Sequence, residues 1–218
     1  MSAYNNRLDK IYDWMAREGI ALVMLQDYKP VKNPAVRWLT GHPEDAFLFL
    51  SVERRSLLVP WDINMAKFMA QADEIVPYGD FDRQAVKALG GALKHMKIPK
   101  NSRVEIPGAT SYPMFLKYVE GIQDYDIICR EGGLKAELEK YRAVKDEEEI
   151  AIYRKIAALT GDLVDLLEKN VRSKKLKTEA DVALFIEGEC RKRGCEGTGF
   201  NIIAAGPSRS FGIHAFPS

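Results

Sequence analysis

ALVML, residues 21–25, is an uninterrupted apolar run, and it decides how the first half of the chain is interpreted. A run of this length without alternating polar residues is typical of a strand that is covered on both faces, as in a parallel sheet. Before it, apolar residues recur at helical spacing over residues 3–18, and Gly19 supplies a stop for that helix. We therefore expect a helix that leads into a fully buried strand.

Short apolar runs and helical patterns alternate from this strand to about residue 130. Further strands are expected at residues 36–41, 46–52, 56–60, 74–78, 103–106 and 125–130, and helices at 63–71, 81–96 and 111–120. The segment has no internal repeat, and its glycines lack the spacing of a phosphate-binding loop. This alternation predicts an α/β domain with a mixed sheet and helices on its faces.

Two helix-start signatures mark the second half of the chain. Asp146 opens an acidic run that can cap a helix, and Thr178 is followed three residues later by an acid, which is a second capping signal. Two adjacent apolar stripes along the helix after Asp146 predict burial over a broad face. We place the first domain at residues 1–130, a linker helix at 131–145 and a second domain at 146–218.

Composition narrows the class of protein. The 32 Lys and Arg residues nearly balance the 31 Asp and Glu residues, so charge gives no argument for a nucleic-acid partner. No apolar run approaches the ~20 residues that span a bilayer, and residues 1–6 lack the pattern of a signal peptide. We therefore expect a cytoplasmic protein with no nucleic-acid or membrane partner.

Cysteine usage agrees with that expectation. The three cysteines, Cys129, Cys190 and Cys195, are an odd number without a tight framework, which favours reduced thiols. A metal site at Cys190 and Cys195 is the less favoured alternative, because structural zinc usually needs four ligands and no further cysteine or nearby histidine completes the set.

The candidate functional residues lie in the last stretch, FNIIAAGPSRSFGIHAFPS (200–218). Residues 200–205 are long enough for one buried strand, and the Gly-Pro-Ser that follows predicts a turn. His214 then lies among small and aromatic residues. Taken alone, a single histidine is more often structural than catalytic, and we expect His42 and His95 to be structural or merely exposed.

Several segments resemble the Xaa-Pro aminopeptidase, prolidase and creatinase family of pita-bread metallopeptidases. Residues 142–150, RAVKDEEEI, resemble the R-x-x-K-D-x-x-E-I start of its catalytic domain, and residues 178–183, TEADVA, resemble its T-E-x-D-V-A helix start. The segment 194–214 is similar to the family's G-x-x-F-x-x-I-V-A-x-G…H pattern. Residues 36–41 are similar to V-R-Y-L-T-G, with Trp38 in place of tyrosine. Each motif is weak alone, but their order along the chain makes the set fairly specific.

The resemblance implies a two-domain plan and an activity. An N-terminal α/β domain helps to form a homodimer, and a pita-bread α+β domain holds two divalent metal ions (manganese, cobalt or zinc) in a cage of two Asp, one His and two Glu. The implied reaction is hydrolysis of the bond between a first residue and a following proline, in a dipeptide or a longer peptide. The implied partner is therefore a proline-containing peptide substrate.

Roles for two residues follow from the same resemblance. His214 matches the family histidine that lies beside the metal pair without ligating it. Its implied catalytic role is to hydrogen-bond the substrate or to stabilise the tetrahedral intermediate, as a positioned donor near developing oxyanion charge would. Phe200 is most simply a core residue at a strand start, and its alternative role is substrate binding, as a wall of the proline pocket.

The resemblance stops short of the metal ligands. In the family all five ligands follow this histidine, whereas residues 197–218 contain no Asp or Glu. We therefore expect residues 146–218 to be an incomplete pita-bread domain, from a longer or a shortened protein, and the 218-residue chain itself to be inactive. Two alternatives stay open: a creatinase-like hydrolase of C–N bonds without metals, and a non-catalytic dimerisation or binding module on the same fold.

Overall fold

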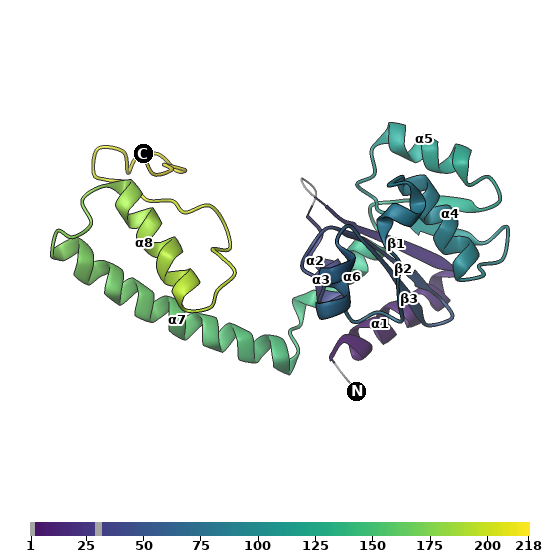
Figure 1. Cartoon of the computed structure of the whole chain (residues 1–218), viewed down its shortest axis with the longest axis horizontal. Helices are drawn as coiled ribbons and strands as arrows, with labels where there is room; N and C mark the ends of the chain where they lie inside the picture. Colours follow the sequence, from purple (N-terminus) through teal and green to yellow (C-terminus); the bar gives the residue numbers. More distant parts are fainter. Residues whose placement is uncertain (1–2, 29–31) are drawn as a thin grey trace. The chain divides into compact units, whose positions relative to one another are not determined.

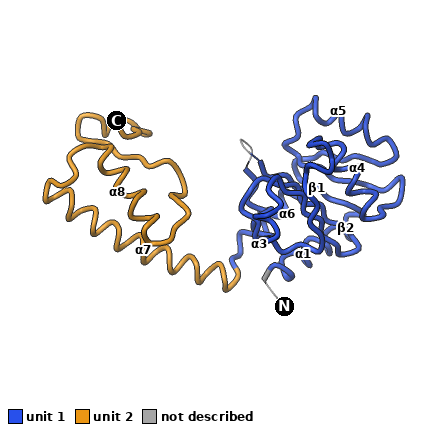
Figure 2. Tube along the Cα trace, in the orientation of Figure 1, with its two compact units in different colours: residues 1–145 blue, residues 146–218 orange. Residues whose placement is uncertain are grey.

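The computed structural model describes residues 3–28 and 32–218 and divides the chain into two compact units (Figure 2). The first unit is Met1–Lys145 and the second unit is Asp146–Ser218. The first unit contains α1 (Ala3–Glu18), β1 (Leu22–Asp27), α2 (Pro34–Thr40), β2 (Ala46–Ser51), β3 (Arg55–Pro60), α3 (Ile63–Met69), β4 (Glu74–Ile75), the 3-10 helix η1 (Tyr78–Phe81), α4 (Ala85–His95), β5 (Arg103–Ile106), α5 (Tyr112–Gly121), β6 (Asp126–Cys129) and α6 (Leu134–Ala143). The second unit contains α7 (Glu147–Arg172) and α8 (Glu179–Lys192). Across the described residues, no helix is both long enough and apolar enough to cross a membrane.

Among the described residues, a six-stranded mixed sheet forms the centre of the first unit, in the order β4-β3-β2-β1-β5-β6. Figure 1 labels three neighbouring strands of this sheet, β1, β2 and β3. β1 pairs antiparallel with β2 and parallel with β5, and β2 and β3 form an antiparallel hairpin. The register places Met24 opposite Phe49, and Phe49 opposite Leu57 on the next strand. This arrangement confirms the predicted α/β class with a mixed sheet.

Alternate side chains of β1 point to opposite faces of the sheet and enter two separate cores. Val23 and Leu25 pack in one core with α1, α2, α3 and α6. Leu22 and Met24 pack in the other core with α4 and α5. All four side chains are buried. Residues 22–25 of the apolar run therefore lie in a strand that is covered on both faces, as the composition of the run predicts.

Residues 36–41 belong to helix α2 and its cap, so the predicted strand there is wrong. Asn33 caps the helix, because its side-chain oxygen accepts a hydrogen bond from the backbone N–H of Ala35 at 3.1 Å. Pro34 stands at the first helical position, where its missing N–H costs nothing. Gly41 ends the helix in the left-handed region, with φ of 77°. These boundary signals outweigh the apolar run between them.

α6 is an integral part of the first unit. Leu134 and Leu138 are buried in the same core as α1. Glu105 on β5 accepts a hydrogen bond from the backbone N–H of Leu134 at 2.5 Å and another from Nε of Arg130 at 3.0 Å. Since the residue before α6 provides no side-chain cap, this carboxylate satisfies one of the free N–H groups at the helix start. The segment 131–145, which we expected to be a linker, therefore packs as part of the first unit.

Both helix starts that the sequence predicts in the second unit are confirmed. Asp146 and Glu149 form a reciprocal capping box at the start of α7. Thr178 and Asp181 form the same box at the start of α8. In each box the side chain of the first residue and that of the acid three positions later satisfy one another's backbone N–H groups.

The second unit exposes apolar side chains that the sequence patterns place in a core. Leu163 is the one buried residue of α7, whereas Ile152 and Tyr153 on the same helix are 62% and 61% exposed. Residues 200–205 form no strand, because a strand needs a neighbour to pair with and the described second unit contains none. The predictions of a broadly buried helix and of a buried strand at 200–205 are therefore wrong for this structure.

Candidate functional site

Phe200 and His214, the two residues singled out by the sequence, lie in residues 200–218, which we call the His214 segment. Both side chains are exposed, and Phe200 has 78% of its surface open to solvent. The His214 ring stacks against Phe216, with ring centroids 6.5 Å apart and planes inclined by 19°. Among the described residues nothing hydrogen-bonds the imidazole, so both of its ring nitrogens are available to a ligand.

The His214 segment is fastened to the start of α8 by one carboxylate. Glu179 accepts hydrogen bonds from the backbone N–H of Gly206 at 2.7 Å and from the backbone N–H of Ser218 at 3.2 Å. It also forms an ion pair with the guanidinium of Arg209. The Gly206 hydrogen bond, with smaller contributions from Ser218 and Arg209, lowers the pKa of Glu179 below its ordinary value. Glu179 therefore stays ionised at neutral pH and holds the segment at Gly206, at Arg209 and at its last residue, Ser218.

Arg209 closes the loop that carries His214. Its Nη2 donates a hydrogen bond to the backbone oxygen of Phe216 at 3.0 Å, and its Nη1 contacts both Glu179 and the Ser218 hydroxyl. The backbone N–H of Phe216 in turn donates to the carbonyl of His214 at 3.0 Å. The imidazole thus stands on a loop whose ends are fixed by an ion pair and by backbone hydrogen bonds. Such a loop can present a hydrogen-bond donor or acceptor to a ligand in a defined position.

Sequence reasoning did not predict the roles of Glu179 and Arg209. Glu179 falls within the helix-start signature, where Thr178 and Asp181 suffice for the capping box. Its carboxylate is therefore left over for another partner. The presence of an acid that the capping box does not use could have indicated a further contact. The sequence alone could not show that its partner is Arg209.

The residues do not fit the two-metal centre that the family resemblance implies. Over residues 3–28 and 32–218, no group of three or more His, Cys, Asp or Glu side chains is placed to hold a metal ion. Cys190 and Cys195 are both free and partly exposed, and burial raises the pKa of the Cys190 thiol. These two thiols find no third ligand among the described residues, so a metal site there has no support.

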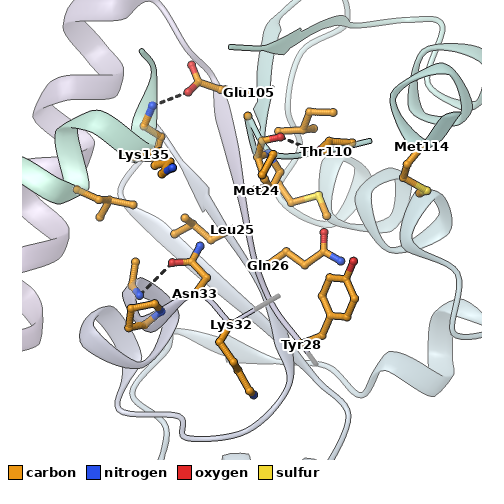
Figure 3. A pocket seen from close by; sticks show the side chains of 18 of the residues that line it. Met24, Leu25, Gln26, Tyr28, Lys32, Asn33, Glu105, Thr110, Met114 and Lys135 are labelled. Atoms are coloured by element: carbon orange, nitrogen blue, oxygen red, sulfur yellow. Dashed lines mark hydrogen bonds between the residues drawn. The ribbon is translucent and has the colours of Figure 1, made fainter. Parts of the chain in front are cut away.

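A cavity of about 630 Å³ lies in the first unit, at the ends of β1 and β5 (Figure 3). Side chains of α2, α5 and α6 complete its lining, whereas Phe200 and His214 take no part in it. Sequence reasoning did not predict this cavity. The parallel pairing of β1 with β5 could have indicated it, because ligand crevices in α/β sheets open at the carboxyl ends of parallel strands.

Comparison with known proteins identifies the first unit. The model of the creatinase/prolidase N-terminal domain matches residues 7–127, more than half of the chain. The chain belongs to the creatinase/prolidase N-terminal domain family. An uncharacterised peptidase of Methanocaldococcus jannaschii is 24% identical over 217 residues, which are 98% of this chain and 54% of that protein. This creatinase/prolidase chain therefore spans about half the length of the curated relative that it matches.

Solved structures extend the likeness beyond the family domain. The prolidase from Pyrococcus horikoshii matches 98% of this chain and 56% of its own, with a TM-score of 0.74 and 21% identity. The X-Pro aminopeptidase from Thermotoga maritima matches 97% of this chain and 56% of its own, with a TM-score of 0.77 and 20% identity. At these identities the likeness establishes the fold, and it includes the second unit of the creatinase/prolidase chain.

Proposed function

We propose that this chain contributes the N-terminal domain and the first part of a pita-bread catalytic domain to a peptidase that cleaves Xaa-Pro bonds. One observation carries the proposal: the structural likeness to a prolidase covers 98% of the chain and so runs past residues 7–127 into the His214 segment. Two of the matched structures are a prolidase and an X-Pro aminopeptidase, and these proteins suggest the substrate class.

In this proposal His214 is the catalytic residue that these 218 residues supply. Its imidazole can donate a hydrogen bond to the carbonyl oxygen of the scissile bond, where negative charge develops in the transition state. The ion pair between Glu179 and Arg209 acts through the loop and positions His214. Phe200, which is exposed in this structure, is proposed to line the pocket for the proline ring.

The proposed enzyme depends on two divalent metal ions, manganese, cobalt or zinc. The described residues contain no set of ligands for these metal ions. In the proposed enzyme, other residues therefore supply the metal ligands. It also includes a homodimer in the cytoplasm, following the family resemblance.

A second candidate function, a non-catalytic assembly module, is favoured by a specific observation. The second unit exposes large apolar side chains on α7, on α8 and in the His214 segment, including Tyr153, Leu184 and Phe211. Contiguous exposed apolar surface commonly marks a face that another protein covers. This candidate predicts that the protein assembles normally but cleaves no peptide.

Bond specificity distinguishes the two functions. The gene product is purified at its native length, supplied with manganese or cobalt, and given Ala-Pro, Ala-Ala and an Xaa-Pro tripeptide. The peptidase proposal expects cleavage of the Xaa-Pro bonds, with Ala-Ala left intact. If all three peptides stay uncut by a protein of verified mass and fold, the peptidase proposal fails and the assembly function is favoured.

A further inference from the structure

The cavity in the first unit lies where the chain changes faces of the sheet. β1 and β5 are parallel neighbours. The chain leaves β1 for α2, which packs in one core, and leaves β5 for α5, which packs in the other. Adjacent parallel strands whose connections diverge in this way leave a crevice at their carboxyl ends, and this is the usual ligand position in open α/β sheets. The cavity volume of about 630 Å³ is within the usual range for small-molecule sites.

Polar groups that the fold does not use gather around this cavity. Gln26 and Tyr28, two residues apart on one face of the chain, make no side-chain hydrogen bond to any described residue. The guanidinium of Arg142 is likewise without a partner among the described residues. Asn33 uses its side-chain oxygen to cap α2, which leaves its amide N–H₂ group as a donor. Figure 3 shows Gln26, Tyr28 and Asn33 around the cavity.

Tyr118 is an independent sign that the cavity is built for a ligand. The residue lines the cavity and is only 1% exposed, yet within the described structure its hydroxyl has no hydrogen-bond partner. A buried hydroxyl without a partner costs free energy, and native folds rarely keep one without a reason. Burial raises the pKa of Tyr118, with smaller contributions from Tyr78 and Tyr28, so the group is a neutral donor at neutral pH.

The charges of the lining select a ligand with one negative charge. Of the three cations in the lining, Lys32 pairs with Asp45 and Asp27 outside it and Lys135 pairs with Glu139, whereas Arg142 has no ion partner among the described residues. The oxygens of Glu105 are already occupied by the backbone of α6 and by an arginine. The positive charge of Arg142 and several free donors therefore remain for an anion. The rest of the lining is largely apolar and includes Met24, Leu25, Met114, Leu134 and Leu138.

We propose that this cavity binds a small organic monocarboxylate with an apolar body. Its carboxylate accepts hydrogen bonds from Arg142 and from the free phenol and amide donors, and its body packs on the methionine and leucine side chains. This site belongs to the first unit alone and does not depend on peptidase activity.

Methionine methyl signals test the proposal with a readout local to the cavity. The full chain, labelled with [¹³C-methyl]methionine, is titrated with 3-phenylpropionate to millimolar concentration. The Met24 and Met114 signals are expected to shift because both residues line the cavity. Met15 and Met96 are buried elsewhere in the two cores, and their signals are expected to stay in place. If Met24 and Met114 do not move, or if only Met15 and Met96 move, the proposal is overturned.

Two variants with matched controls test the assigned contacts. Arg142→Gln and Tyr118→Phe are each expected to weaken binding about tenfold, because each removes a hydrogen bond to a charged group. Arg17→Gln and Tyr112→Phe change exposed residues of the same types outside the lining, and they are expected to bind as the wild type does. Unchanged affinity in both cavity variants, with the fold verified by circular dichroism, would contradict the assignment.

Two further probes test the charge of the ligand. The neutral amide, 3-phenylpropionamide, matches the carboxylate in shape and is expected to bind much more weakly. Phenyl phosphate, which carries more negative charge, is also expected to bind more weakly than the carboxylate. If either probe binds more tightly than 3-phenylpropionate, the assignment to a monocarboxylate is wrong.

Discussion

Arg209 forms an ion pair with Glu179 across 30 positions of sequence, and this contact joins the start of α8 to the loop that carries His214. The same carboxylate accepts hydrogen bonds from two backbone N–H groups of that loop, at Gly206 and Ser218. The position of the proposed catalytic histidine is therefore set by a residue outside the segment that contains it.

Glu179→Ala is expected to loosen the His214 segment without affecting the first unit. Amide hydrogen exchange at Gly206 should become about tenfold faster or more, because a lost hydrogen bond to a charged group is worth at least that factor. Glu187→Ala on the same helix, which removes only a surface pair with Arg191, serves as the control and should leave that exchange unchanged. Equal exchange at Gly206 in wild type and Glu179→Ala would show that the carboxylate does not hold the loop.

The same contact predicts a dependence on pH. The pKa of Glu179 is lowered in the folded state, so its stabilising effect is fully present above the ordinary pKa of glutamate, about 4.3. This stabilising effect is lost as the pH falls through the lowered pKa of Glu179 in the folded state. The protection of the Gly206 amide, corrected for intrinsic exchange, should therefore be constant near neutrality and decline only in acid.

Glu105→Ala is expected to destabilise the first unit by about 3 kcal/mol, because it leaves the Leu134 N–H without its acceptor and deprives Arg130 of a partner. Urea unfolding followed by tryptophan fluorescence measures this directly, since all three tryptophans, Trp14, Trp38 and Trp61, lie in the first unit. Glu120→Ala, an exposed acid on α5, should stay within about 0.5 kcal/mol of wild type. If both variants changed the free energy of unfolding by a similar amount, the role assigned to Glu105 would be wrong.

His42 is expected to make the first unit less stable in mild acid. The residue is fully buried, and burial lowers its pKa, although the nearby carboxylates Glu44, Asp27 and Asp62 partly oppose this. The unfolded chain therefore takes up this proton first, and stability falls as the pH drops below about 6.5, until the folded pKa is passed. Urea unfolding between neutral and acid pH should show a steeper decline for wild type than for His42→Phe. If the free energy of unfolding depended on pH in the same way in both proteins, His42 would not be the source of the acid sensitivity.

Gly41→Ala is expected to destabilise the first unit by about 1 to 2 kcal/mol, because the left-handed backbone at this helix end disfavours a side chain. An added Cβ would also lie 3.0 Å from the Tyr4 hydroxyl and 3.3 Å from the Met69 carbonyl oxygen. Gly161→Ala, within α7 and with open space around it, should leave the tryptophan-detected unfolding unchanged. A neutral Gly41→Ala would mean that the α2 boundary is not fixed by this glycine.

Local signals account for what the sequence predicted correctly. The capping boxes at Asp146 and Thr178 are formed within four residues, so their partners stand next to each other in the sequence. Residues 22–25 of β1 are apolar and buried on both faces, and they need no distant information either. The strand wrongly predicted at 36–41 had local helix signals on both sides, and these should have outweighed the apolar run.

Distant contacts account for what could not be predicted. The hydrogen bond from the Leu134 N–H to Glu105 spans 29 positions, and no hydrophobic periodicity in the sequence predicts it. The run at 200–205 has the composition of a strand, but composition does not supply a partner strand. His214 could be selected from a family pattern, whereas the residues that hold its loop became visible only in three dimensions.

The most direct test of the central claim is the rate of Xaa-Pro cleavage by the native-length gene product, with and without His214. With manganese or cobalt added, the wild type should cleave Ala-Pro, and His214→Ala should lower kcat by about 10²- to 10⁴-fold. His95→Ala, which removes the other exposed histidine, at the end of α4, should retain the wild-type rate. The 218-residue chain alone should cleave nothing, since its described residues hold no metal ligand set. Full activity in His214→Ala, or no cleavage by the wild type, would contradict the account.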